Sequence, residues 1–249
     1  MNREVSNIIL GTMPLFSGNA EDHFPHLDMA FEMGCNIIDT ALGYGDSEVT
    51  IGKWMKARNN RKDIVLITKG CHPTMYRKRV TPFDIATDLH ESLARLGTDY
   101  IDIYLLHRDD LDQPVGPIVE ELNKHFRAGK IRAFGGSNWT HQRLEEANQY
   151  AKEHGLEPFR VSSPSYSLAE QACEPWAPGC VTISGPEGEE ARAWYAETQM
   201  PVFAYSSLAR GFFSGRVTRE RFLAEQGKFL DARVLFSGKA TREQLTGHG

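Results

Sequence analysis

Residues 101–107 read IDIYLLH, a short apolar run that ends in one ionisable side chain. A strand that is buried on both faces of a parallel sheet has this near-continuous apolar character. Two earlier runs have the same form, NIID at 36–39 and IVLITK at 64–69. Their ionisable ends are separated by 30 and then 38 residues, which leaves room for one helix and one strand in each interval. The three runs therefore indicate successive βα units.

This alternation continues along most of the chain, and its 249 residues are close to the ~250 of a typical (β/α)8 barrel. We predict an α/β fold of this TIM type, in a single domain over residues 1–249. Region 212–249 is atypical because it contains little apolar sequence, so the barrel can be incomplete or irregular at its last βα units. The other strands are expected at 7–11, 131–135, 159–163 and 201–205, with 233–236 as the candidate for the eighth.

Capping residues mark the helices between these strands. Thr81-Pro82 begins one helix, with Asp84 at its third helical position and Gly97 at its end. The long segment 170–189 is rich in Pro and Gly and is expected to be a loop. The other helices are expected from Asp46 or Ser47, from Pro114 or Pro117 to Gly129, and from Thr140 to Gly155.

The composition excludes several classes of protein. Hydrophobic residues make up 41% of the chain and charged residues 24%, as in an ordinary globular protein. A formal charge of −5 gives no reason to expect nucleic acid or an anionic membrane as a partner. No apolar run is long enough to span a bilayer, and the first ten residues lack a secretory core, so a cytoplasmic location is expected.

The four cysteines form no Cys-x-x-Cys pair, and we expect no metal site. The sequence does not indicate an oligomeric state.

The ionisable strand ends should lie together, because the carboxyl ends of barrel strands converge on the face that carries active sites. Asp39, Lys69 and His107 end their strands, and Tyr44 follows the first of them in a Gly-flanked loop. Each residue alone has a plainer interpretation: a helix cap, a solvated lysine, a structural histidine or a surface tyrosine. All four in one barrel pattern favour a joint role in proton transfer.

Several motifs in the right order resemble the aldo-keto reductase family over roughly residues 7–215. The resemblance implies a barrel that reduces aldehydes and ketones, sugar-like compounds among them, to alcohols with a nicotinamide cofactor. That cofactor is most often NADP(H) and less often NAD(H). Tyr44 would be the general acid, supported by Asp39, Lys69 and His107. The motifs are IIDTALGYG at 37–45, LITKG at 66–70, SLARLGTDYIDIYLLH at 92–107, GKIRAFGGSNW at 129–139 and VFAYSSLARG at 202–211.

Simple chemistry agrees with these roles. A carbonyl that accepts hydride develops negative charge on oxygen and needs a proton donor. Free tyrosine has a pKa of about 10, and an adjacent ammonium favours the phenolate. Lys69 can supply that charge, Asp39 can keep Lys69 charged and oriented, and His107 can donate a hydrogen bond to the carbonyl.

The resemblance also implies a cofactor site. Ser137 and Asn138 would bind the nicotinamide carboxamide and Tyr205 would stack on the ring, although an ordinary turn and a core tyrosine are the plainer alternatives. Gly11 and Thr12 could allow close approach of the cofactor, or could form a tight turn. The remaining candidates for cofactor binding are Asp39, Ser206, Leu208, Gly238 and Arg242.

Two departures from the family pattern affect this site. Ser163 stands where most relatives carry a Gln three residues before the Tyr of the sixth strand motif, here Tyr166. Residues 238–245, GKATREQL, resemble the motif that grips the adenosine 2′-phosphate, but Ala240 replaces the usual Arg, with Lys239 and Arg242 nearby. Two alternatives to a working reductase are a cofactor-binding regulatory protein, which the resemblance also allows, and a catalytically weak relative whose shortened C-terminus leaves the barrel open.

Overall fold

The structure is a computed structural model that describes residues 5–13, 18–170 and 178–215. The chain divides into two compact units. The first unit contains Met1–Ser137 and Glu146–Arg160, and the second contains Asn138–Glu145 and Val161–Gly249. The single domain expected over 1–249 stays a prediction.

The first unit is built on a parallel sheet whose strands follow one another in sequence order, β1-β2-β3-β4-β5. All six residues of β3 are buried, which explains why the strand has no polar–apolar alternation. The short first strand is the main difference from the expected bounds. The strands are β1 (Leu10–Gly11), β2 (Ile37–Asp39), β3 (Val65–Gly70), β4 (Ile101–Leu106) and β5 (Ile131–Ser137).

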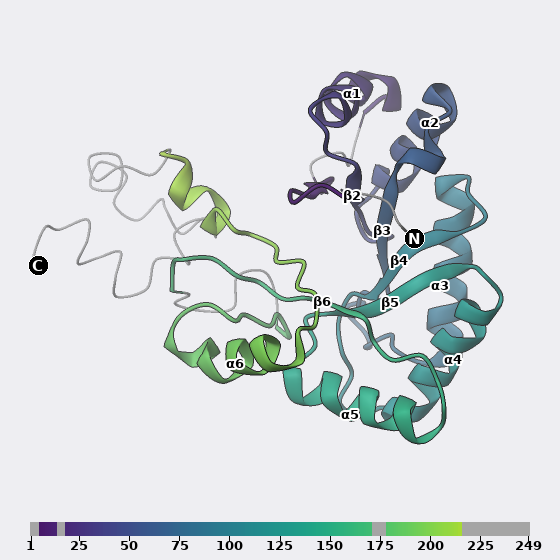
Figure 1. The fold of residues 1–249 in the computed structure, drawn as a ribbon. Coiled ribbons are helices and arrows are strands. Elements are labelled where there is room, and N and C mark those ends of the chain that lie inside the picture. Colours follow the sequence, from purple (N-terminus) through teal and green to yellow (C-terminus); the bar gives the residue numbers. More distant parts are fainter. Residues whose placement is uncertain (1–4, 14–17, 171–177, 216–249) are drawn as a thin grey trace, which may run out of the picture. The chain divides into compact units, whose positions relative to one another are not determined.

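Helices cover the outer side of this sheet, and Figure 1 shows α2, α3 and α4 side by side along strands β3–β5. The predicted cap of α3 is confirmed, because Thr81 and Asp84 form a reciprocal capping box and Gly97 ends the helix in the left-handed region. The unit contains α1 (Phe24–Glu32), α2 (Ser47–Arg58), α3 (Pro82–Leu96) and α4 (Val115–Arg127), with 3-10 turns at Ala20–His23 and Arg61–Asp63, while α5 (His141–Glu153) crosses the unit boundary.

The core of the first unit lies between the sheet and these helices. Trp54 of α2 is fully buried, and its indole nitrogen donates to Asp28 of α1 at 2.8 Å. Phe134 of β5 packs edge-on against Phe159, with ring centroids 5.5 Å apart. The first contact joins α2 to α1, and the second packs the segment before β6 against β5.

The second unit contains β6 (Val161–Ser163) and α6 (Glu189–Thr198), with 3-10 turns at Pro186–Gly188 and Ala209–Ser214. A strand over 201–205 was expected, but this prediction was wrong, since only isolated bridges form, Ser162 with Val202 and Ser165 with Tyr205. Pro164 lies between the two bridging serines and has no N–H to donate, which interrupts the ladder. The predicted eighth strand at 233–236 lies outside the described residues.

Candidate active site

Three of the expected residues lie at the carboxyl ends of adjacent parallel strands. Asp39 is the last residue of β2, Lys69 is the second-last of β3, and His107 directly follows β4. The backbone N–H of His107 donates to the carbonyl of Gly70 at 2.8 Å, which continues the pairing of β3 with β4. Sheet register alone therefore gathers these side chains at one end of the first unit.

Asp39 and Lys69 form an ion pair. The ammonium Nζ of Lys69 donates to both carboxylate oxygens of Asp39, at 2.6 and 2.7 Å, and to the backbone carbonyl of Thr40 at 3.0 Å. An ammonium can only donate, and all of these partners are acceptors. The prediction that these side chains lie within reach of each other is confirmed.

The protonation state of Lys69 is set by opposing effects. The residue is only 3% exposed, and burial by itself lowers the pKa of a lysine. The negative charge of Asp39, together with the charge and hydrogen bonding of Tyr44, outweighs burial, so the pKa of Lys69 is raised above its usual value. Lys69 is a fixed positive charge throughout the physiological pH range.

Tyr44 lies in a tight loop between β2 and α2. Its backbone N–H donates to Ala41 O at 2.9 Å, and its carbonyl accepts from Ser47 N at 3.0 Å. The ammonium of Lys69 lies 5.2 Å from the centroid of the Tyr44 ring, which is half-buried. The loop thus holds the phenol beside the buried charge while leaving part of it open to solvent.

His107 completes the group. Its ring meets that of Tyr44 edge to face, with centroids 5.7 Å apart and an interplanar angle of 80°. Burial lowers the pKa of His107 well below its usual value, and the positive charges of Lys69, His72 and Arg108 act in the same direction. The imidazole is therefore neutral at pH 7.

A set of buried hydroxyls lies behind Asp39. Thr12 donates to the Asp39 carbonyl from both its backbone N–H, at 3.0 Å, and its hydroxyl, at 2.9 Å. Ser47 donates to the Thr12 hydroxyl at 2.8 Å and accepts from Thr40 at 3.0 Å. Thr12 thus supports the end of β2, while the neighbouring Gly11 is exposed, with nothing within 4 Å of the position a Cβ would take.

A carboxylate not predicted from the sequence contacts the residue next to Lys69 and, through Arg95, the loop that carries Tyr44. Glu48 is fully buried and accepts from the hydroxyl of Thr68, the neighbour of Lys69, at 2.6 Å. Its other oxygen lies 3.3 Å from Arg95, whose guanidinium also donates to the carbonyl of Gly45. An acidic residue on the buried side of α2 was the available signal.

The second unit holds several expected cofactor residues. The side-chain oxygen of Asn138 accepts from the Tyr205 hydroxyl at 2.6 Å and from Val181 N at 3.1 Å. Asn138 and Ser206 both have left-handed backbones, with φ of 60° and 61°. Leu208 is 58% exposed. Ser137 is buried at the end of β5 in the first unit, and Gly238 and Arg242 lie outside the described residues.

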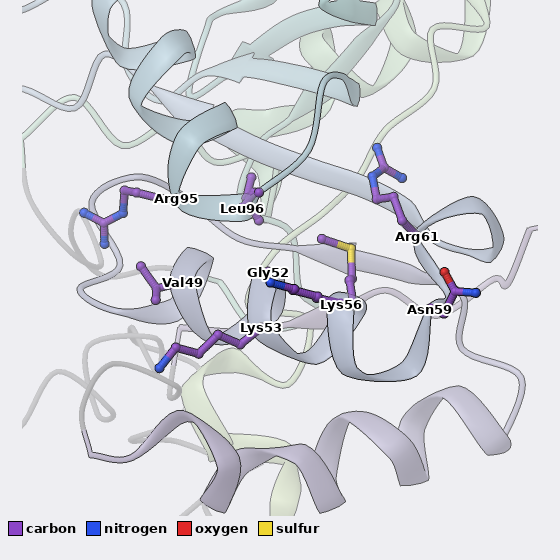
Figure 2. A pocket seen from close by; sticks show the side chains of 10 residues that line it. Val49, Gly52, Lys53, Lys56, Asn59, Arg61, Arg95 and Leu96 are labelled. Atoms are coloured by element: carbon purple, nitrogen blue, oxygen red, sulfur yellow. The ribbon is translucent and has the colours of Figure 1, made fainter.

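A separate hollow of about 370 Å³ lies where α2 and α3 end, toward the amino ends of the strands. Figure 2 shows Lys53, Lys56, Arg61 and Arg95 among its lining residues. Arg61 is paired with Asp102 at 2.9 Å, and Arg95 contacts Glu48. With its two arginines engaged in structural pairs and its position away from Lys69, this hollow is not the candidate active site.

Membrane-spanning helices and metal sites are both absent from the described ranges. None of the helices there combines the length and the apolar character that crossing a bilayer requires. Within the same ranges, no three His, Cys, Asp or Glu side chains are grouped so as to hold a metal ion.

Comparison with known proteins gives the family. Residues 7–231 match the profile of the Aldo/keto reductase family. The chain belongs to this family. It is 29% identical over 228 residues to the aldo-keto reductase YhdN of Bacillus subtilis, covering 87% of this chain and 62% of that protein. It is 32% identical over 215 residues to norsolorinic acid reductase B of Dothistroma septosporum, covering 81% of this chain and 51% of that protein.

A solved aldo-keto reductase has the same fold type. The structure of the thermostable aldo-keto reductase Tm1743, in complex with the inhibitor epalrestat, aligns with a TM-score of 0.68 and 27% identity. The alignment covers 91% of this chain and 77% of that one. The predicted α/β fold of TIM-barrel type, with its allowance for incompleteness, is confirmed. The chain nevertheless spans less than two thirds of the length of the two curated relatives.

Proposed function

We propose that this aldo-keto reductase reduces an aldehyde or ketone to an alcohol by hydride transfer from NADPH, with Tyr44 as the general acid. The observation that carries the proposal is the cluster at the strand ends, in which Tyr44 lies beside the buried Lys69–Asp39 pair and against His107. A proton donor, a fixed cation and a neutral hydrogen-bonding imidazole are the groups that carbonyl reduction needs.

Tyr44 donates its phenolic proton to the oxygen of the substrate as the carbonyl carbon accepts hydride. The phenolate that remains is stabilised by the ammonium of Lys69. Asp39 prevents Lys69 from losing its own proton, because two short hydrogen bonds and an opposite charge favour the ammonium. The proton therefore leaves from Tyr44 rather than from Lys69.

His107 positions the carbonyl. A neutral imidazole has one N–H donor, and this donor can bind the carbonyl oxygen without adding a second positive charge beside Lys69. Burial keeps the ring in that neutral form. We infer that His107 orients the substrate and does not supply the transferred proton.

The residues present fit a nicotinamide cofactor, which supplies the hydride when it is bound. In the second unit, Tyr205 and Val181 bind the side-chain oxygen of Asn138 and so fix the orientation of its amide, whose NH2 is the donor for a carboxamide oxygen. In the first unit, Gly11 leaves open space at its surface. NADPH is proposed over NADH from the resemblance of residues 238–245 to the 2′-phosphate motif.

The test is turnover with a panel of aldehydes and ketones, followed as loss of NADPH absorbance. Alongside it, a thermal shift with NADPH measures cofactor binding separately, since a ligand that binds the folded state raises its stability. Turnover that requires both NADPH and a carbonyl supports the proposal. A thermal shift without turnover would replace it by the alternative of a cofactor-binding regulatory or catalytically weak protein.

A further inference from the structure

One side chain of α3 reaches the loop that carries Tyr44. The guanidinium Nη2 of Arg95, near the end of α3, donates to the backbone carbonyl of Gly45. Gly45 directly follows Tyr44, and its backbone has a left-handed conformation, with φ of 53°. The Tyr44 loop is therefore tied to a helix residue 50 positions farther along the chain, as well as by its own backbone hydrogen bonds.

A buried carboxylate orients the guanidinium of Arg95. Oε2 of Glu48 lies 3.3 Å from Nε of Arg95, and both atoms are shielded from solvent. The other oxygen of Glu48 accepts from the hydroxyl of Thr68 at 2.6 Å, which fixes the carboxylate against β3. The five N–H donors of a guanidinium have a rigid fork geometry. With Nε facing Glu48, the direction in which Nη2 points toward Gly45 is therefore set.

Close packing of α2 against α3 determines where the Arg95 side chain begins. A Cβ on Gly52 of α2 would lie only 2.6 Å from the carbonyl oxygen of Leu96 and 2.9 Å from that of Arg95, so this approach requires a glycine. Figure 2 shows Arg95 and Leu96 at the end of α3, next to Gly52. A further partner, the 53% exposed Glu91, is 3.6 Å from Arg95 and contributes little. The buried carboxylate and the loop carbonyl are therefore the contacts that fix the guanidinium.

We propose that Arg95 is a positioning residue for the proposed acid: it holds the loop so that the Tyr44 phenol stays beside Lys69. The inference rests on the proposed function, which makes Tyr44 the proton donor. Tyr44 stands between two exposed glycines, Gly43 and Gly45, and glycine has the greatest backbone freedom. A misplacement of about 1 Å can cost about 10²-fold in rate, so an anchor on this loop affects the chemistry.

The plainer role of Arg95 is to compensate a buried negative charge. Glu48 is fully buried, and this burial raises the pKa of its carboxyl, against the opposing effects of Thr68 and Arg95. If compensation were the whole role, removing the charge of Glu48 would make Arg95 dispensable. The proposal instead requires the guanidinium even without that charge, because its contact with Gly45 remains. A Glu48→Gln background separates the two roles, since the amide oxygen can still accept from Thr68.

Steady-state carbonyl reduction in that background tests the proposal. Glu48→Gln alone keeps the contact between Arg95 and Gly45 and should retain most of kcat. Adding Arg95→Met should lower kcat by about 10–100-fold and leave KM for NADPH unchanged. Adding Arg95→Lys instead should restore part of the loss, because its ammonium can still donate to the Gly45 carbonyl. With Tyr44→Phe also present, Arg95→Met should cause no further loss, because it acts through Tyr44. An unchanged kcat on adding Arg95→Met, or a full further loss in the Tyr44→Phe protein, overturns the inference.

A measurement without turnover separates this inference from the proposed reaction. The Tyr44 ring lies edge to face against His107, so the NMR signals of the ring in the full chain report whether it stays in place. Adding Arg95→Met to the Glu48→Gln background should shift these signals. Arg58→Met removes another arginine–carboxylate pair of α2 and should leave them in place. Unchanged Tyr44 signals overturn the inference whether or not the enzyme is active. Shifted signals in a protein without turnover support the anchoring and count against the proposed function alone.

Discussion

At the scale of single residues, two equally buried bases are driven to opposite protonation states. Lys69 is 3% exposed and His107 is 6% exposed, and burial disfavours the charged form of both. Lys69 stays charged because Asp39 contacts it directly. His107 becomes neutral because the charges that act on it are positive. The site thus has one fixed cation beside Tyr44 and one neutral hydrogen-bonding group at pH 7.

The role of Tyr44 as the acid can be tested by removing its hydroxyl. Tyr44→Phe keeps the ring that packs against His107 but cannot donate a proton. We expect kcat for carbonyl reduction to fall by about 10²–10⁴-fold, the usual contribution of general acid catalysis, with cofactor binding unchanged. Tyr76→Phe, at an 88% exposed tyrosine, serves as the control. Near-normal turnover of Tyr44→Phe would exclude it as the proton donor.

The fixed charge of Lys69 predicts a shift in pH dependence. Lys69→Met keeps most of the length of the side chain but removes the cation that stabilises the phenolate. Alcohol oxidation needs the phenolate as base, so its optimum should move to higher pH. The pH profile of oxidation measures this, with the exposed Lys56→Met as control. A profile that stays in place with activity retained would show that Lys69 does not act on Tyr44.

The cluster of Asp39, Tyr44, Lys69 and His107 is predictable from the sequence because each residue lies at or just after a strand end, and strand register brings these ends together. The contacts of Glu48 and the position of His72 are not. Glu48 acts through contacts to Thr68 and Arg95 that depend on how the helices pack, and His72 is placed by a left-handed Cys71. The place of Glu48 on the buried side of α2 can be read from the helical spacing, but its partners and the left-handed conformation of Cys71 cannot.

At the scale of elements, strands β3 and β4 meet very tightly beside the site. A Cβ on Gly70 would lie 1.9 Å from the Tyr104 hydroxyl and 2.9 Å from Asp88. Tyr104 is fully buried, and its hydroxyl has no hydrogen-bond partner among the described residues. Gly70 therefore leaves the space that the Tyr104 phenol occupies, directly after Lys69.

A double-mutant cycle tests this packing. Gly70→Ala should lower the free energy of unfolding by about 1–3 kcal/mol, the usual cost of overpacking a core. Tyr104→Phe should be neutral or stabilising by about 1 kcal/mol, because it removes a buried hydroxyl that pairs with nothing described. The free energy of unfolding of the double variant, measured by urea unfolding, should be higher than the value obtained by adding the effects of the two single substitutions. Strict additivity would mean that the two groups do not compete for space.

The amino end of α3 predicts acid sensitivity. Arg77, with help from Thr81, holds the pKa of Asp84 well below its usual range. A carboxyl with a depressed folded pKa stabilises the fold above its unfolded pKa of about 4, and this contribution is lost as pH falls further. Thr81→Ala should cost about 1 kcal/mol at neutral pH, as for other helix caps.

Asp84→Asn should reduce the loss of unfolding free energy that wild type shows below about pH 4. The control Asp99→Asn, at an exposed aspartate, should leave that loss unchanged. Thermal unfolding measured across acid pH compares the two variants. Identical acid dependence in Asp84→Asn and wild type would exclude the Asp84 carboxyl as the source of the effect.

Element boundaries show where sequence patterns stop being sufficient. The α3 cap was predicted correctly, because Thr81, Pro82 and Asp84 act within one turn. The strand expected over 201–205 was not, because its pairing depends on Pro164, some forty residues earlier. Local chemistry fixes a helix end, whereas a strand also depends on the segment that pairs with it.

At the scale of the whole molecule, the candidate residues fall in two compact units. The proton-transfer group lies in the first unit, and Asn138 and Tyr205 belong to the second. The proposed preference for NADPH depends on the segment 238–245, which lies outside the described residues. It is therefore a prediction from sequence alone, and it needs a test that does not assume a structure for residues 216–249.

The cofactor preference gives that test. If Lys239 and Arg242 bind the 2′-phosphate, NADPH should raise Tm more than NADH does, because stabilisation grows as RT ln(1 + [L]/Kd) and reaches about 2.7 kcal/mol at 100 Kd. Arg242→Ala and Lys239→Ala should reduce the rise in Tm caused by NADPH toward that caused by NADH. The rise caused by NADH should stay unchanged, because NADH has no 2′-phosphate for these side chains to bind. Deleting residues 230–249 should lower Tm without ligand and sharply weaken NADPH binding. If the deletion changes neither, the apolar run at 233–236 does not complete the barrel, and cofactor binding must depend on residues 1–229.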